Sequence, residues 1–210
     1  MSKHRMKQER PAQAVVAPVV PAVEYGRTRV YATGIDWLVG GVVSGLPGVV
    51  AYAVLTGTDK PMKTLYAFRE AGFSAGTTML IAALCLLFGL GYYVIVPWLV
   101  FPGQTLGKRF MHLRMVKQDG QPMHLQDYLL RQVVGLVLIE GAATATATYV
   151  RVMITAGSGF YVDGYFSIFW NIVTLFSMFL VFGTKRHLAL HDYLAKTQVV
   201  AAPMTKLEVV

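Results

Sequence analysis

Two long stretches without a single charged side chain constrain the fold of this chain more than any other feature. Neither Asp, Glu, Lys nor Arg occurs between Ala71 and Gly107 or between Gly164 and Thr184. A helix needs about 20 mainly apolar residues to cross the hydrocarbon core of a bilayer, and both stretches are long enough. Only 14% of all residues are charged, whereas soluble domains contain about a quarter. The chain is therefore predicted to be an integral membrane protein.

Two further apolar stretches each contain one carboxylate. Residues 30–55 are apolar except for Asp36, and residues 132–150 are apolar except for Glu140. Because proline interrupts the helical hydrogen-bond ladder, Pro47 is expected to kink the first of these helices or to split it. The predicted fold class is an all-α membrane protein, a bundle of about four transmembrane helices with a cytoplasmic connector between helices 2 and 3. The four spans are predicted at roughly 30–55, 76–101, 132–154 and 164–183.

The basic residues lie mostly on one side of these spans. They gather before the first span, between the second and the third, and after the fourth, whereas the other side carries only Lys60, Lys63 and Arg69, with Arg151 at its boundary. Lys and Arg are enriched in cytoplasmic loops, so both termini are predicted to be cytoplasmic, in a bacterial plasma membrane. Anionic lipid headgroups as partners account for the net charge of +8, and no nucleic-acid role is expected.

Composition divides the chain into three parts. Residues 1–26 are basic and then rich in Pro and Ala, which predicts a disordered N-terminal tail. Residues 27–200 form the predicted transmembrane domain, and residues 201–210 a C-terminal tail. The only cysteine, Cys85, lies inside a span, so neither a disulfide nor a cysteine-based metal site is expected.

The connector is the most patterned polar segment. Its residues 113–117 predict an extended run, and residues 118–121 predict a turn. Residues 124–131 place their apolar side chains on one face, which predicts an interfacial helix leading into the third span. Just before the connector, four aromatic residues predict an aromatic belt at the membrane interface: Tyr92, Tyr93, Trp98 and Phe101.

Three separated motifs resemble those of the RDD family. They are RVYATGID from Arg29 to Asp36, GQTLGKRFMHLRMVKQDGQPM from Gly103, and KRHLALHDYLAKTQVV with Asp192 as the second aspartate. The resemblance runs from about residue 27 to residue 200. It implies a membrane protein of a family without one agreed activity, in which some members are associated with sodium–proton antiport and others with quality control or accessory roles. The residues that match the family motifs are Arg29, Asp36, Gly103, Thr105, Gly107, Lys108, His191 and Asp192.

The first intramembrane carboxylate, Asp36, follows Arg29 by two helical turns. The two side chains would lie on one face but about 10 Å apart along the axis, so each is expected to meet a partner on another segment. A lone carboxylate inside a bilayer is costly unless it is paired, protonated or hydrated. Asp36 is therefore either an ion or proton site, or half of a buried pair with a residue such as Lys108, Arg109 or Arg29.

The second carboxylate, Glu140, begins a polar stripe. On a continuous helix it shares one face with Thr144, Thr148 and Arg151. The fourth span offers a matching row, namely Ser167, Asn171 and Thr174. These rows could line a hydrated path with Glu140 as the carrier of a proton or cation, or they could make ordinary hydrogen bonds between helices.

Other functional classes find little support in the sequence. There is no nucleophile beside a base and no cofactor loop, so neither enzymatic activity, catalytic residues nor a cofactor is expected. His187 and His191 lack a third strong ligand, so no metal site is expected. Three functions stay open. The first is a component of cation or proton transport, the second is a non-catalytic accessory or scaffold membrane protein that binds a partner through its cytoplasmic loop, and the third is a lipid-interacting or structural bundle. A bundle this small predicts a homo-oligomer or a membrane partner protein if it transports.

Overall fold

Three long apolar helices dominate the computed structural model, which describes residues 22–202. They are α1 (Ala22–Thr56), α3 (Ala75–Leu90) with its continuation η1 (Gly91–Val100), and α7 (Asp163–Gly183). Each is long and apolar enough to cross a membrane. Leucine, valine and phenylalanine side chains are exposed along all three, as expected for helices surrounded by lipid tails. These helices coincide with the first, second and fourth predicted spans.

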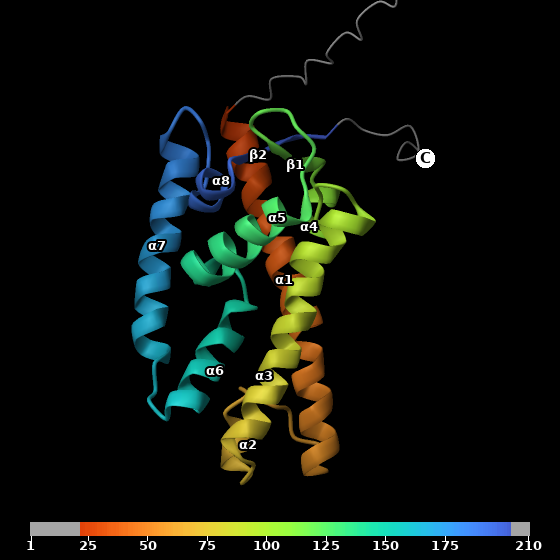
Figure 1. Cartoon of the computed structure of the whole chain (residues 1–210), viewed down its shortest axis with the longest axis vertical. Coiled ribbons are helices and arrows are strands. Elements are labelled where there is room, and N and C mark those ends of the chain that lie inside the picture. Colours follow the sequence, from red (N-terminus) through yellow and green to blue (C-terminus); the bar gives the residue numbers. More distant parts are fainter. Residues whose placement is uncertain (1–21, 203–210) are drawn as a thin grey trace, which may run out of the picture.

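The third predicted span is not one helix, so the prediction of a continuous helix over residues 132–154 is wrong. The chain instead forms α5 (Leu125–Tyr128), η2 (Leu129–Ile139), η3 (Gly141–Ala143) and α6 (Ala147–Ser158). In Figure 1, α5 and the green helix that continues it lie across the upper part of the bundle, and α6 then descends beside α7. The chain still passes from one end of the bundle to the other, but it does so through a break.

Side chains of α7 explain the break, because they take backbone acceptors that a helix would need. Trp170 Nε1 donates to the Leu138 carbonyl at 3.0 Å, and the Thr174 hydroxyl donates to the Glu140 carbonyl. The Trp170 ring also packs so closely on Gly141 that an added Cβ there would lie 2.0 Å from it. Helices are interrupted where a side chain enters the hydrogen-bond ladder, and hydropathy alone does not reveal such a contact.

The connector and the C-terminal motif fold together into a small cap. The cap contains α4 (Leu106–Phe110), β1 (Leu113–Lys117), α8 (Leu190–Ala195) and β2 (Thr197–Ala201). The short helix α2 (Ala67–Glu70) lies at the opposite end of the bundle. β1 pairs antiparallel with β2, from Leu113 opposite Ala201 to Lys117 opposite Thr197. The extended run at 113–117 and the turn after it are confirmed, whereas the second strand was not foreseen.

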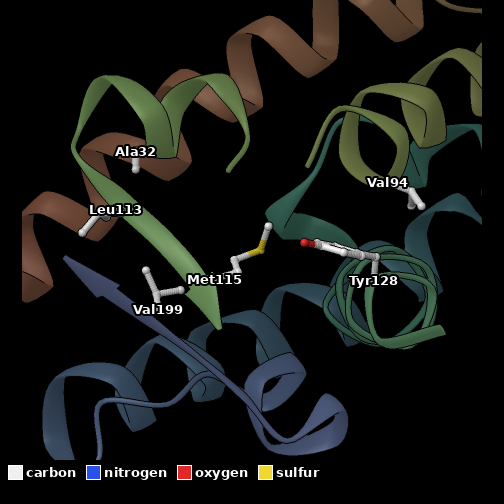
Figure 2. Packing of buried hydrophobic residues seen from close by; sticks show 6 residues of the cluster. All are labelled: Ala32, Val94, Leu113, Met115, Tyr128 and Val199. Atoms are coloured by element: carbon white, nitrogen blue, oxygen red, sulfur yellow. The ribbon is translucent and has the colours of Figure 1, made fainter. Parts of the chain in front are cut away.

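An apolar cluster joins this cap to the helices. It consists of Ala32, Val94, Leu113, Met115, Tyr128 and Val199. Figure 2 shows the Met115 side chain pointing from β1 toward the Tyr128 ring, with Val199 beside it on β2. The cluster combines α1, η1, α5 and both strands, so the sheet is fixed onto the bundle rather than attached by a loose loop.

The start of α1 and the end of β2 lie at the same end of the bundle (Figure 1). This arrangement agrees with an even number of crossings, although the cytoplasmic location of that end stays a prediction. Most of the two predicted tails lies outside the described residues. Of the described part, residues 22–26 belong to α1 and Ala201 belongs to β2. Pro47 lies inside α1 and does not split it.

Candidate functional site

Asp192 is the centre of the most deeply buried ionic cluster. Its carboxylate is fully buried and lies 2.7 Å from Arg29 Nη2 through Oδ2. Oδ1 accepts a hydrogen bond from Arg131, and the Ala189 backbone N–H donates to Oδ2 at 3.0 Å. Arg131 Nη1 also lies 2.6 Å from the Thr197 hydroxyl. One carboxylate thus joins α1, η2, α8 and β2.

The local sequence explains how Asp192 comes to lie there. It lies in the first turn of α8, where its carboxylate accepts a hydrogen bond from the Ala189 backbone N–H. Carboxylates commonly cap the start of a helix in this way. Lys196 then adopts a left-handed conformation, which ends α8 and turns the chain into β2. Burial alone would raise the pKa of Asp192, but the guanidiniums of Arg131 and Arg29 hold it well below its usual range. Asp192 is therefore charged at every physiological pH.

The Asp36 carboxylate joins α1 to the connector motif. Tyr92 donates to Oδ1 at 2.7 Å, and the Gly107 N–H donates to the same atom at 2.8 Å. Thr105 donates to Oδ2 at 2.5 Å, and Lys108 Nζ lies 3.0 Å from Oδ2. Of the ion-pair partners considered from the sequence, the structure brings Lys108 to Asp36. The prediction that Arg29 and Asp36 meet partners on other segments is confirmed.

Glycine is required at position 107 because α4 begins directly against α1. A Cβ at Gly107 would lie 2.2 Å from the Ala32 carbonyl oxygen and 2.8 Å from Asp36 Oδ1. Gly103 serves the same loop with a φ of +81°, and its carbonyl accepts from Met115 N at 2.7 Å. The glycines of the connector motif therefore allow backbone to approach backbone.

Gly107→Ala should destabilise the protein by about 1–3 kcal/mol, the usual cost of forcing an extra carbon into a packed site. Its thermal unfolding in detergent is the measurement. Gly91→Ala is the matched control, because a Cβ there would meet nothing within 4 Å and alanine favours a helix over glycine. Equal melting temperatures for the two variants would contradict the close approach of α4 to α1.

Glu140 lies at the break in the third apolar segment and is paired with His191. The Glu140 side chain is nearly fully buried, and His191 Nδ1 lies 2.9 Å from its Oε1. The His191 backbone N–H donates to the same oxygen at 2.8 Å. His191 Nε2 lies 3.9 Å from Asp192 Oδ1, so the imidazole stands between two carboxylates.

The predicted polar stripe does not form. Glu140 and Thr144 precede α6 in the broken region, so they do not continue the face of Thr148 and Arg151. Arg151 Nη2 donates to Thr148 Oγ1 at 2.9 Å, and these two remain together at the other side of the break. Asn171 is exposed and bonds to Ser167 on its own helix, so it does not join Glu140.

One cavity connects the two intramembrane carboxylates. It has a volume of about 360 Å³, and both Asp36 and Glu140 line it. The other charged or titratable groups on its wall are Arg29, Tyr93, Lys108, Arg131 and His191. Within residues 22–202 no three His, Cys, Asp or Glu side chains are grouped to hold a metal ion. The cavity is thus lined by side chains that pair with one another.

The sequence did not predict the role of several residues in this region. Tyr92 and Tyr93 are buried and both donate to Asp36, to its side chain and its backbone carbonyl respectively, so the aromatic-belt prediction is wrong for them. Arg131 is one of the basic residues between the second and third predicted spans, but it is 1% exposed and pairs with Asp192 inside the protein. A carboxylate inside a span requires hydrogen-bond donors or a cation. The tyrosine hydroxyls of the neighbouring span could have been predicted as such donors.

Comparison with known proteins identifies the family. Residues 27–196 match the family model described as the RDD family. That range includes all three motifs and most of the chain. No curated protein and no solved structure matches the sequence.

Proposed function

Because the chain belongs to the RDD family of membrane proteins, we propose that it is a component of cation/proton transport in which Glu140 and His191 carry the proton. The partner of Glu140 carries this proposal. Asp192 and Asp36 are paired with arginine and lysine, which stay charged at physiological pH. Glu140 is paired with a histidine, the side chain whose charge changes near neutral pH.

The three carboxylates therefore have different roles in the proposal. Protonating Asp192 or Asp36 would leave a buried cation without its anion, which is strongly unfavourable. The partners of Glu140 are the imidazole and the backbone N–H of His191, so its protonation would leave no arginine or lysine without its anion. We therefore assign the proton exchange to Glu140 with His191, while Asp36 and Asp192 hold the surrounding segments.

The broken third segment also supports transport. Irregular backbone at membrane depth is tolerated where it is buried in protein or lines a cavity, and transporters commonly place binding sites at interrupted helices. Here the interruption begins at Glu140, and Glu140, Ala142 and Ala143 line the cavity. The proton carrier Glu140 would thus lie at the point where helix η2 ends.

An enzymatic role has less support. Ser177, Glu140 and His191 all line the cavity, but the Ser177 hydroxyl accepts from Leu190 N at 3.0 Å. His191 Nε2 lies 3.9 Å from Asp192 Oδ1, and Nδ1 lies 2.9 Å from Glu140 Oε1. A serine nucleophile needs a free ring nitrogen beside it, so we propose a non-catalytic protein.

An accessory role through the connector also draws less support. Thr105, Gly107 and Lys108 of the connector motif all bind Asp36 inside the molecule. These motif residues are therefore used to fold the protein. In a crosslinking experiment from exposed positions of the connector, capture of one defined membrane partner would favour the accessory role over transport.

Proton flux in proteoliposomes tests the proposal. The protein is reconstituted with a pH-sensitive dye inside, and a sodium or potassium gradient is imposed. We expect cation-dependent proton movement in the wild type and none in Glu140→Gln, because the amide cannot exchange the proton. Glu70→Gln is the matched control, since Glu70 is an exposed carboxylate in α2 away from the cavity.

Two results would overturn the proposal. One is a wild type that moves no protons under either cation gradient. The other is undiminished flux in a folded Glu140→Gln protein. The thermal unfolding of each variant in detergent establishes that it is folded before its flux is compared.

A further inference from the structure

The geometry points to a route for the proton beyond the cavity. It follows the broken third segment from Glu140 to the ion pair of Arg151 and Asp163, and Trp170 closes it. This inference rests on the proposed function and adds the exit of the path. Asp163 is the first residue of α7, and Figure 1 shows that the junction of α6 and α7 is at the end of the bundle away from the β-strands.

Buried polar atoms without a bond mark this route. Buried polar groups are almost always bonded to protein or to water. In the described part of the chain, Arg131 Nε and Thr146 Oγ1 are buried without a hydrogen-bond partner. At the far end, Arg151 Nε and Asp163 Oδ1 face each other at 3.4 Å without a regular hydrogen bond, and the Tyr66 hydroxyl lies beside Asp163. They belong to the cavity wall, to the break, and to the far end. Such groups are where internal water binds, so together they outline a hydrated track.

The middle of the track lies where α6 begins. Thr146 is fully buried, and its backbone N–H donates to the Thr144 hydroxyl at 3.2 Å. Next to it, the fully buried Ser44 of α1 lies 3.5 Å from the Tyr149 hydroxyl through its Oγ. The threonines, the serine and the tyrosine place hydroxyl groups in the bundle interior, where each can both donate and accept.

The far end of the route is formed by an ion pair and not by packed apolar side chains. Arg151 Nε lies 3.4 Å from Asp163 Oδ1, and both side chains are less than one fifth exposed. Burial raises the pKa of Tyr66, and the nearby charge of Asp163 adds to the rise. Unlike Asp36 and Asp192, Asp163 and its partner are 19% and 18% exposed, so Arg151 keeps contact with water when this carboxylate takes a proton, whereas its guanidinium repels a metal cation. The exit would therefore conduct protons and exclude cations.

Trp170 separates this ion pair from the cavity. Its ring is 2% exposed, packs on Gly141 at the break, and has the Arg151 guanidinium carbon 5.5 Å from its centroid. The same side chain thus touches the start of the broken segment and the cation near its end. Moving this ring would join the cavity to the far ion pair.

Cysteine labelling tests the route without requiring transport. Thr146→Cys and, as control, Ala82→Cys are each made in a Cys85→Ala chain and exposed to a membrane-impermeant thiol reagent. Ala82 is equally buried but packs in an apolar cluster. Adding Trp170→Phe should speed labelling at position 146 about tenfold, which corresponds to roughly 1.4 kcal/mol in the free energy of opening, and should not change position 82. Equal labelling at both positions, with and without the tryptophan change, would overturn the route.

Asp163→Asn supplies an independent test by flux. It should lose most of the wild-type proton flux, whereas Asp59→Asn, an exposed carboxylate of the same end, should keep it. If the wild type conducts and Glu140→Gln does not, but Asp163→Asn conducts normally, the exit is wrong and the proposed carrier stands. If the wild type conducts no protons, the proposed function is wrong. The labelling experiment then still shows whether position 146 can be reached by water.

Discussion

Asp192→Asn is expected to lower the free energy of unfolding by about 3–5 kcal/mol, the cost of leaving buried charge uncompensated. Arg131 is 1% exposed, and the Arg29 side chain is 11% exposed. Both guanidiniums would keep their charge and lose their shared anion. Thermal unfolding in detergent should show a melting temperature lower by roughly 6–20 °C for a chain of this size.

The pH dependence of unfolding gives the same interaction a second readout. The pKa of Asp192 is lowered on folding, so its stabilising effect is complete above the pKa of the unfolded carboxyl and declines as the pH falls below about 4. Asp192→Asn should remove this part of the acid sensitivity. Asp119→Asn is the control, because its side chain is 58% exposed. An unchanged melting temperature in Asp192→Asn would show that the two arginines do not depend on this charge.

The spans were predictable because each is a local property of the chain. A run without charges is sufficient to place α3 with η1, and α7, in a membrane. The third segment was also apolar enough to be predicted as a span, yet its helix is broken by Trp170 and Thr174, which reach it from α7. Such a contact depends on how two distant segments pack, and a hydropathy pattern contains no information about it.

The sequence predicted which charged residues form the site, but it did not predict which of them pair with one another. The motifs supplied Arg29, Asp36 and Asp192, and bilayer energetics required partners for the acids. The sequence did not reveal that Arg29 pairs with Asp192 and not with Asp36, since ion-pair partners far apart in sequence are brought together only by the fold. A second strand after α8 was also unforeseen, because its pairing with β1 is what makes it a strand.

A double-mutant cycle on Asp36 and Lys108 distinguishes a structural ion pair from an ion-carrying group. Asp36→Asn alone should lower the free energy of unfolding by about 3–5 kcal/mol. The new amide N–H₂ would face Lys108 Nζ, which lies 3.0 Å from Asp36 Oδ2 in the wild type. Removing that cation with Lys108→Met should recover part of the loss, with a coupling energy of about 0.5–3 kcal/mol.

The reason for the recovery is that the asparagine can still be bonded in the double variant. Its oxygen can accept from Tyr92 and Gly107, as Asp36 Oδ1 does, and its amide can donate to the Thr105 hydroxyl. Lys60→Met, at an exposed lysine, is the control for the loss of a positive charge. In proteoliposomes the folded double variant should keep most of its proton flux, because Glu140 and His191 are untouched. Recovery of stability without recovery of flux would instead make Asp36 the group that carries the ion.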